Sequence, residues 1–435
     1  MPQRIASHTL GCKLNFAETS AMVQRFVDDG WEVVDFADKA DLYVVNTCTV
    51  TAIAEKKCRN AIRQAVAANP DAIVAVVGCF AQNAADDIAR IEGVDIILGN
   101  DQKHNLPAHV KRYQQQHGGT PRHDIDTAEP RSFAPVYSLH DRTRTFFKVQ
   151  DGCDYFCTYC AIPFARGRSR SATVAETVDV AHQIAASGAK EVVLTGVNTG
   201  TFGQQHGETF LDLIRALDGI QGIERYRISS IEPNLLTDDI IDFCAHSRAF
   251  LPHFHIPLQA GSDKVLHLMH RRYDTRFYAD LLGKIKALMP DACIAADVMV
   301  GFNGEDDTEF GHVMEFINSL PISYLHVFTF SERPGTAVLR MGERIDVHHR
   351  REHSRQLHEL SLHKKNAFYT GQQGKTRPVL WESDVKKGMM YGFTDNYIRV
   401  RKPYNAAEVN TVTPFLLDNY VEKEDVFEKS FPTSK

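Results

Sequence analysis

Apolar runs alternate with amphipathic helical patterns along the first hundred residues. Four short apolar or β-rich runs predict strands at residues 4–10, 41–46, 72–77 and 94–98. Between them, residues 17–29 and 52–68 place apolar side chains three to four positions apart, a spacing that is typical of helices. Strands and helices that alternate at this pitch predict a doubly wound parallel sheet.

A second series of strands and helices starts near residue 143. Strands are predicted at residues 145–150, 191–195, 225–230, 253–258, 293–300 and 324–330. Helices are predicted at residues 173–187, 211–217, 238–245, 263–269, 276–288 and 308–319. Six such units fall short of a closed barrel and predict an open, partial TIM-like (β/α)6 barrel. A long polar helix is then expected at residues 347–369.

These patterns predict an α/β protein of three domains. We expect the doubly wound domain at residues 1–118, a linker at 119–140, and the barrel with its long helix at 141–369. Short β runs at residues 377–381, 389–394 and 397–401 predict a small C-terminal β-barrel within residues 370–435.

Composition narrows the class of protein. The chain has 435 residues, of which 43% are hydrophobic and 24% charged, as in ordinary globular proteins. Its net charge of −6 argues against general coating of nucleic acid, although one domain can still carry a basic patch. No apolar stretch is long enough for a membrane span, and the N-terminus lacks the pattern of a signal peptide. We therefore expect a cytoplasmic protein without a membrane partner, and a monomer.

Three of the nine cysteines lie within eight residues, at Cys153, Cys157 and Cys160. Three thiolates on one loop can hold three irons of a [4Fe–4S] cluster, which leaves the fourth iron open for a ligand. The alternative is a structural zinc site, for which His140 is the candidate fourth ligand. The loop follows the first barrel strand, at the end where such folds place catalysis.

A second set of cysteines is scattered along the first domain. Cys12, Cys48 and Cys79 each follow a predicted strand and precede a helix. Because the carboxyl ends of parallel strands meet at one sheet edge, these thiols are expected to converge, although core packing is the alternative. The remaining Cys58, Cys244 and Cys293 are interpreted as small buried side chains.

The Cys153–Cys160 spacing, with Tyr159 before the last cysteine, resembles the radical S-adenosylmethionine (SAM) superfamily. The resemblance implies that the open iron binds SAM and that Tyr159 contacts its adenine. It implies that Thr195, Gly196 and Asn198 bind the amino acid end of SAM. It also implies that further residues line the pocket, namely Glu232, His255, Gln259, Asp297 and Gly301. For the two glycines, a simple turn after a strand is the alternative.

Nearly the whole chain resembles one branch, the radical SAM methylthiotransferases. The resemblance rests on the runs around Cys12, Cys48 and Cys79, and on residues 161–170, 230–234 and 253–263. It implies two [4Fe–4S] clusters, and SAM both as methyl donor and as source of a 5′-deoxyadenosyl radical. The C-terminal domain resembles a TRAM module, an RNA-binding barrel, so tRNA is the expected partner. The reducing electron donor and the sulfur source are left open by the sequence.

Residues 9–15, 144–152 and 166–170 resemble the group that acts on carbon 2 of N6-threonylcarbamoyladenosine at tRNA position 37, next to the anticodon. Alternatives are isopentenyl-adenosine in tRNA, an aspartate of a ribosomal protein, or a non-catalytic iron–sulfur RNA-binding sensor. The acidic group on threonylcarbamoyladenosine favours a cationic pocket. Arg166, Arg168 and Arg170 in the barrel are therefore candidates for this pocket, with phosphate contact or solvent exposure as the alternative. In the C-terminal domain, a locally basic stretch at residues 370–410 predicts RNA contacts at Lys386, Lys387, Arg399 and Arg401.

Overall fold

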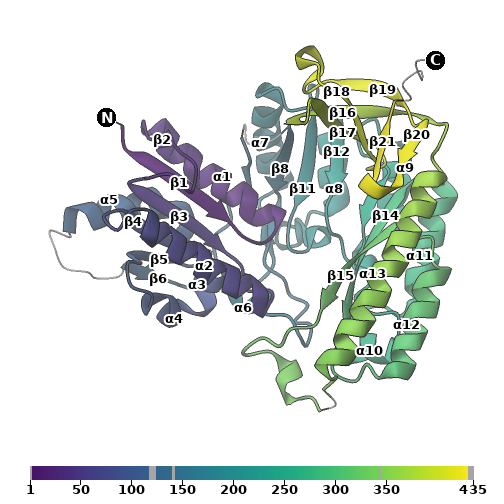
Figure 1. The fold of residues 1–435 in the computed structure, drawn as a ribbon, viewed down its shortest axis with the longest axis horizontal. Coiled ribbons are helices and arrows are strands. Elements are labelled where there is room, and N and C mark those ends of the chain that lie inside the picture. Colours follow the sequence, from purple (N-terminus) through teal and green to yellow (C-terminus); the bar gives the residue numbers. More distant parts are fainter. Residues whose placement is uncertain (1, 117–123, 140–142, 343, 430–435) are drawn as a thin grey trace.

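The first sheet is a six-stranded parallel sheet in the order β2-β1-β3-β4-β5-β6 (Figure 1). A computed structural model describes residues 2–116, 124–139, 143–342 and 344–429. The strands are β1 (Arg4–Thr9), β2 (Glu32–Val33), β3 (Leu42–Thr47), β4 (Ile73–Gly78), β5 (Ile96–Leu98) and β6 (Asp124–Asp126). The helices are α1 (Lys13–Asp28), α2 (Ala52–Ala68), α3 (Cys79–Asn83), α4 (Ala85–Ala89) and α5 (Leu106–Gln116).

Helices cover both faces of this sheet, as the alternating pattern predicts. On one face Ile62 of α2 packs into a cluster with Val45 and Val76. On the other face Phe26 of α1 and Leu106 of α5 pack into a separate cluster. Every residue of β3 is buried, and its first four residues, 42–45, form the continuous apolar run that is typical of a strand covered on both faces. The doubly wound architecture is therefore confirmed.

The predicted linker at residues 119–140 is not a simple connection. Its segment β6 pairs with β5 and completes the first sheet, and β7 (Val136–Tyr137) pairs antiparallel with β8 (Arg144–Lys148). Both strands are two or three residues long, too short to produce a recognisable alternation. Two domains thus extend into the segment that sequence periodicity leaves unassigned.

The barrel is built from six parallel strands, as predicted. They are β8, β11 (Glu191–Thr195), β12 (Arg225–Ile228), β13 (His253–His255), β14 (Cys293–Val300) and β15 (Tyr324–Thr329). The helices are α7 (Val174–Ala186), α8 (Phe210–Asp218), α9 (Asp238–His246), α10 (Asp263–Leu268), α11 (Thr275–Leu288) and α12 (Asp307–Ser319). Among the described residues β15 pairs with β14 but not with β8, so the barrel is open.

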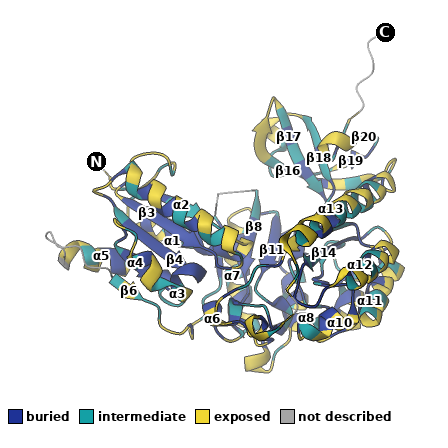
Figure 2. Cartoon of the chain, turned by 60° about the horizontal axis from the view of Figure 1, so that its bottom comes forward, coloured by how far each residue is buried: buried dark blue, intermediate teal, exposed yellow. Residues whose placement is uncertain are grey.

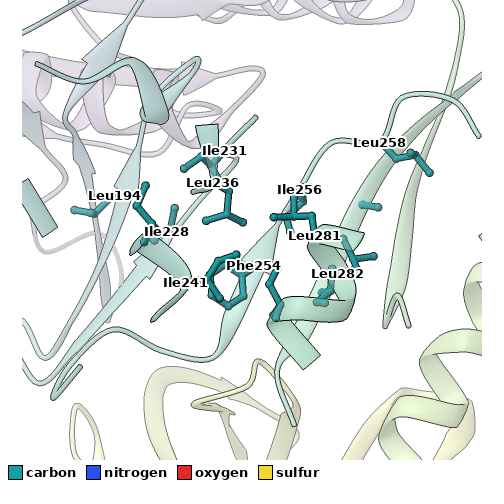
Figure 3. Packing of buried hydrophobic residues seen from close by; sticks show 14 of the residues in the cluster. Leu194, Ile228, Ile231, Leu236, Ile241, Phe254, Ile256, Leu258, Leu281 and Leu282 are labelled. Carbon is teal, nitrogen blue, oxygen red and sulfur yellow. The ribbon is translucent and has the colours of Figure 1, made fainter. Parts of the chain in front are cut away.

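One continuous apolar core joins the barrel strands to their helices. Leu194 of β11, Ile228 of β12 and Phe254 of β13 meet Ile241 of α9 and Leu281 of α11 (Figure 3). Isolated bridges, such as Ser230 to His255, continue the sheet from β12 to β13. The shorter elements β9 (Gln150–Asp151), α6 (Ile162–Arg166) and β10 (Arg170–Ser171) follow β8 and carry the cysteine loop.

The C-terminal domain is a six-stranded sheet in the order β19-β16-β17-β18-β21-β20, reached through the exposed helix α13 (Val347–Thr370) (Figure 2). Its strands are β16 (Thr376–Lys386), β17 (Met389–Thr394), β18 (Arg399–Pro403), β19 (Val412–Leu416), β20 (Asn419–Val421) and β21 (Val426–Glu428). Sequence periodicity predicts the first three of these strands and misses the last three. β19 contains Pro414, which weakens a strand pattern, and β20 and β21 have three residues each, too few to show an alternation. None of the described helices is both long and apolar enough to cross a bilayer.

Candidate active site

The thiols of Cys12, Cys48 and Cys79 meet at the carboxyl edge of the first sheet. Cys12 caps the start of α1, Cys48 follows β3, and Cys79 opens α3 directly after β4. Strands β1, β3 and β4 are neighbours, so this edge brings three distant cysteines together. Gly11 has a φ of +104°, and a Cβ at this position would lie 3.2 Å from the Cys48 sulfur. The turn before Cys12 therefore packs directly on Cys48, and only glycine fits it without strain.

The surroundings of this triad suit metal ligation. Asn100 Nδ2 donates a hydrogen bond to Cys79 Sγ at 3.6 Å, and the Cys12 thiol donates to Asn15 Oδ1 at 3.9 Å. Burial, with smaller contributions from the Cys79 and Cys12 thiolates, raises the pKa of Cys48 to about 12. A metal that binds such thiols must displace their protons, so occupancy is coupled to pH.

The Cys153–Cys160 loop is fixed to the end of β11 by one glutamine. Gln150 Nε2 donates to the Gly152 carbonyl at 2.7 Å, while its Oε1 accepts from the Asn198 backbone N–H at 2.8 Å. Gly152 has a φ of +71°, and a Cβ there would lie 1.9 Å from the carbonyl oxygen of Arg168. The glycine before Cys153 is thus required by the close approach of the facing backbone.

Sequence reasoning missed Arg271, which lies beside this loop. Its Nη1 donates to Cys157 Sγ at 3.2 Å, and its Nη2 pairs with the Glu232 carboxylate. Burial raises the pKa of Glu232, and the charge of Arg271 opposes that rise. In the sequence, Arg271 stands in the polar run 270–272, which resembles a solvated turn and gives no signal of a thiol contact.

The residues that the resemblance assigns to SAM surround the mouth of the barrel. Tyr159 lines a cavity of about 200 Å³ together with Gln259 and Asp297. His255 Nε2 lies 2.7 Å from Asp297 Oδ1. Thr195 Oγ1 is buried without a hydrogen-bond partner among the described residues. An unsatisfied buried hydroxyl at this mouth fits a site that is completed by a polar ligand such as SAM.

Gly301 has a structural reason of its own. Its φ is +74°, and a Cβ would lie 2.3 Å from Cγ of Arg350 on α13. Its backbone N–H donates to Glu305 Oε1 at 2.8 Å. The turn-glycine alternative therefore accounts for this residue without any contact to a cofactor.

A cavity of about 470 Å³ separates the first cysteine triad from the barrel mouth. It is lined by Gly11, Cys12, Lys13, Leu14, Thr195, Gly196, Ser229, Ser230, His253, His255, Asp297, Tyr324, His326, Phe328 and Tyr397. Cys12 of the first domain thus faces Thr195 and Gly196 of the barrel across one space. A reaction that needs both sites has room for a planar substrate between them.

The C-terminal domain also reaches this cavity, through Tyr397. This residue has a φ of +67° in the turn before β18, and its ring contacts that of His253, with 4.4 Å between the ring centroids and an angle of 30° between the ring planes. Burial alone would raise the pKa of Tyr397, but the positive charges of Arg144, Lys13 and Arg227 lower it. The sequence places Tyr397 at the start of a short β run and gives no signal that it lies beside Cys12.

Arg166 and Arg170 require a correction. Arg166 is 1% exposed and lies between Glu18 and Asp151, at 3.1 and 2.9 Å. Arg170 is also buried and pairs with Asp151 at 3.2 Å. Their guanidinium groups form ion pairs within a buried charged network between the first domain and the barrel, and neither group is exposed to contact a substrate. A basic run in sequence cannot distinguish such internal pairing from a binding surface.

The other predicted substrate residues differ in how available they are. Arg168 is exposed and lies over the Phe156 ring. Lys386, the last residue of β16, and Lys387, in the turn that follows, are both exposed. Arg399 lies over the Tyr391 ring at 4.4 Å. Arg401, in contrast, is paired with carboxylates of β21 and the preceding turn. His140, the alternative zinc ligand, lies outside the described residues.

Comparisons with known proteins agree with this arrangement. The radical SAM superfamily matches residues 147–317, and a family described as uncharacterized protein family UPF0004 matches residues 4–99. The structure of the radical SAM methyltransferase TsrM from Kitasatospora setae aligns with a TM-score of 0.56 at 15% identity, over 78% of this chain and 77% of that chain. That likeness shows a shared fold.

Sequence relatives are closer. A threonylcarbamoyladenosine tRNA methylthiotransferase of Bacillus subtilis is 38% identical over 91% of this chain and 89% of its own length. A protein of the same name from Aquifex aeolicus is 35% identical over 92% of this chain and 96% of its own length. A tRNA-2-methylthio-N(6)-dimethylallyladenosine synthase of Roseobacter denitrificans is 28% identical. The chain is therefore an enzyme that belongs to the radical SAM methylthiotransferase family.

Proposed function

We propose that this enzyme adds a methylthio group to carbon 2 of threonylcarbamoyladenosine at position 37 of tRNA. The names of its relatives at 38% and 35% identity support this substrate. One [4Fe–4S] cluster would be held by Cys12, Cys48 and Cys79, and a second by Cys153, Cys157 and Cys160. When bound, the clusters and SAM supply the methyl group, the position for sulfur and the 5′-deoxyadenosyl radical that removes hydrogen from carbon.

The observation that carries the proposal is the shared cavity of about 470 Å³ between Cys12 and the barrel mouth. Carbon 2 of an adenine ring is no acid for a side-chain base, so the radical source and the sulfur must reach the same atom. A cavity with Cys12 of the first triad on one wall, and with Thr195 and Gly196 of the proposed SAM site on the other, supports that requirement. The two sites lie on different domains, so the contact between domains sets the distance between them.

The chain's own residues would position and shield these groups. Gln150 holds the loop of the second triad against the end of β11, at 2.7 and 2.8 Å. Arg271 donates to Cys157 Sγ and pairs with Glu232. Tyr397 closes the cavity from the C-terminal domain, whose exposed Lys386 and Lys387 are suited to phosphate contacts with tRNA.

Two alanine substitutions separate the two proposed clusters. In the reconstituted enzyme, Cys157→Ala should abolish release of 5′-deoxyadenosine. Cys48→Ala should still release 5′-deoxyadenosine but form no methylthio nucleoside on tRNA. Each variant should bind about half of the wild-type iron, because one of two cubane clusters is lost. A normal product yield from Cys48→Ala would overturn the role of the first triad, and Cys244→Ala, at a buried packing cysteine, serves as the control.

A further inference from the structure

A second cavity, of about 320 Å³, opens beside the cavity of about 470 Å³ that lies between Cys12 and the barrel mouth. It is lined by Thr9, Gly11, Cys12, Lys13, Phe16, Arg144, Phe146, Val193, Arg227, Ile228, His253 and Tyr397. Gly11, Cys12, Lys13, His253 and Tyr397 also line the larger cavity, so the two adjoin. Among the described residues, its charged lining side chains are three cations and no carboxylate. A ring held in the larger cavity could extend a side chain into this smaller one.

The two arginines of this cavity are fixed by partners behind the wall. Arg144 Nε donates to Glu382 Oε1 at 2.9 Å, and its guanidinium stacks over Phe393. Arg227 Nε donates to Glu191 Oε1 at 2.7 Å. The same Glu191 also pairs with Arg225, so three arginines share two carboxylates and a positive charge is left in excess.

Lys13 adds a cation that has no such partner. Within the described ranges, its ammonium takes part in no hydrogen bond or ion pair. The residue lines both cavities, next to Cys12. Asp297, across the larger cavity, attracts this ammonium but is hydrogen-bonded to His255. An ammonium that faces a cavity beside two fixed guanidinium groups, with no ion-pair partner among the described residues, is a site for an anion.

His253 independently indicates a polar ligand. Its side chain is buried, with 6% exposure, and neither ring nitrogen has a hydrogen-bond partner in the part of the chain that the structure describes. The ring packs at a tilt against Tyr397, whose hydroxyl accepts from Arg144 Nη1 at 3.4 Å and still has its own proton to donate. Buried ring nitrogens without partners are rare in finished cores, so a ligand that hydrogen-bonds there is expected.

We infer that this smaller cavity is the specificity pocket for the carboxylate-bearing side chain of the substrate base, with Lys13 as the direct partner of the carboxylate. The inference rests on the proposed function and deepens it. Arg144 and Arg227 hold the positive potential, while His253 and Tyr397 supply hydrogen bonds to the hydroxyl and carbamoyl groups. The pocket replaces Arg166 and Arg170 as the element that recognises the acidic group. An apolar isopentenyl side chain would leave all of these groups without partners.

The test uses the reconstituted full-length enzyme and three anticodon stem-loop RNAs that differ only at position 37. One carries threonylcarbamoyladenosine, one carries the same base with its carboxylate converted to a methyl amide, and one carries isopentenyl-adenosine. Fluorescence anisotropy gives the dissociation constants. The wild-type enzyme should bind the carboxylate RNA at least about tenfold more tightly than the amide RNA, a factor that corresponds to 1.4 kcal/mol.

Substitutions then test whether Lys13 is the residue that causes the preference for the carboxylate RNA over the amide RNA. Lys13→Met should bind the two RNAs within about twofold of each other, while Lys13→Arg should keep most of the preference. Lys39→Met, at an exposed lysine of the same domain, should behave as wild type. An undiminished tenfold preference in Lys13→Met would overturn the inference, as would equal binding of the acid and the amide by the wild-type enzyme. The second of these results needs no variant to fold.

Failure of the proposed function gives a different result. Nucleoside mass spectrometry of the three RNAs after turnover reports which base receives the methylthio group. A methylthio product on the isopentenyl RNA alone would overturn the proposed substrate, and the pocket inference with it. A product on the threonylcarbamoyl RNA, combined with equal binding of acid and amide, would overturn the pocket alone.

Discussion

Replacing Glu18 with glutamine should loosen the contact between the first domain and the barrel. Glu18 lies on α1 and is fully buried. It accepts from Lys103 of its own domain at 2.5 Å, and from Lys148 and Arg166 of the barrel at 2.8 and 3.1 Å. The amide keeps the size of the side chain and removes its charge. It also replaces one acceptor oxygen by a donor, although both oxygens of Glu18 accept from Lys or Arg. The substitution therefore tests the charge and the hydrogen bonds of this interface at nearly constant side-chain volume.

The free energy that this substitution removes from the contact between the domains can be estimated from the burial of the charged residues around Glu18. Without Glu18, the buried Lys148, Arg166 and Arg170 share Asp151 as their carboxylate among the described ion pairs. Lys103 loses its one described ion-pair partner. Removing one partner of a buried ion pair typically costs about 3–5 kcal/mol, because the remaining charges stay desolvated. At about 1.4 kcal/mol per factor of ten, 3 kcal/mol corresponds to a population of the open state about 150-fold higher.

The stabilisation that Glu18 provides should decrease as the pH is lowered. Burial alone would raise the pKa of Glu18, but the charges of Arg166, Lys103 and Lys148 hold it well below its usual value. A lowered pKa in the folded state stabilises the protein above the unfolded-state pKa of about 4.3 and ceases to do so as the pH falls through the folded-state pKa. The difference between wild type and Glu18→Gln is therefore full at neutral pH and shrinks in acid.

Hydrogen exchange measured by mass spectrometry gives the opening free energy of α1 and β8 directly. Exchange in these segments of Glu18→Gln should be at least about 100-fold faster than in the wild type at pH 7. The matched control is Glu129→Gln, whose carboxylate is largely exposed and pairs with exposed Arg131, so the change should stay below about 1 kcal/mol. Exchange of α1 within about fivefold of wild type in Glu18→Gln would refute the reasoning.

Three further substitutions test the site and the RNA surface. Gly152→Ala should lower the iron content per chain, since the new Cβ would lie 1.9 Å from a facing carbonyl oxygen. Arg271→Gln should lower the reduction potential of the cluster on that loop, followed by EPR during a redox titration, because Cys157 loses a cationic donor at 3.2 Å. Lys387→Ala should weaken tRNA binding and reduce its salt dependence, whereas Arg401→Ala, already paired with carboxylates, should change affinity less than about twofold.

Each of these three substitutions has a matched control and a result that would contradict the prediction. The control for the first is Gly188→Ala, because Gly188 also has a positive φ but no atom lies within 4 Å of its Cβ position. Normal iron content in Gly152→Ala would contradict the claim that the close approach at Gly152 is needed to hold the cluster loop. Arg271→Lys should restore most of the potential, and an unchanged potential in Arg271→Gln would exclude the contact. Equal loss of tRNA affinity in the lysine and Arg401 variants would contradict the distinction between free and paired charges.

Much of the fold follows from local pattern. The helix predicted at residues 52–68 is α2 with the same bounds, because Thr51 caps its start and Asn69 and Pro70 end it. The convergence of Cys12, Cys48 and Cys79 could be predicted from the sequence, because the carboxyl ends of parallel strands lie at one edge of the sheet. Both inferences use only short-range signals and a general rule of topology.

The rest of the site depends on contacts that no local pattern contains. Tyr397 meets His253 only because the C-terminal sheet docks on the barrel through Arg227, which donates to backbone carbonyls of that sheet. Arg166 reads as a basic surface residue, yet Glu18 from another domain buries it. The number of charges in a segment can be read from sequence, but their pairing is set by the arrangement of domains.

The central claim is methylthiolation of threonylcarbamoyladenosine, and nucleoside mass spectrometry of bulk tRNA tests it most directly. Cells with and without this gene are compared for both methylthio nucleosides. Loss of the methylthio group from threonylcarbamoyladenosine alone is the predicted result. Loss from isopentenyl-adenosine instead, or no change in either nucleoside, would contradict the account.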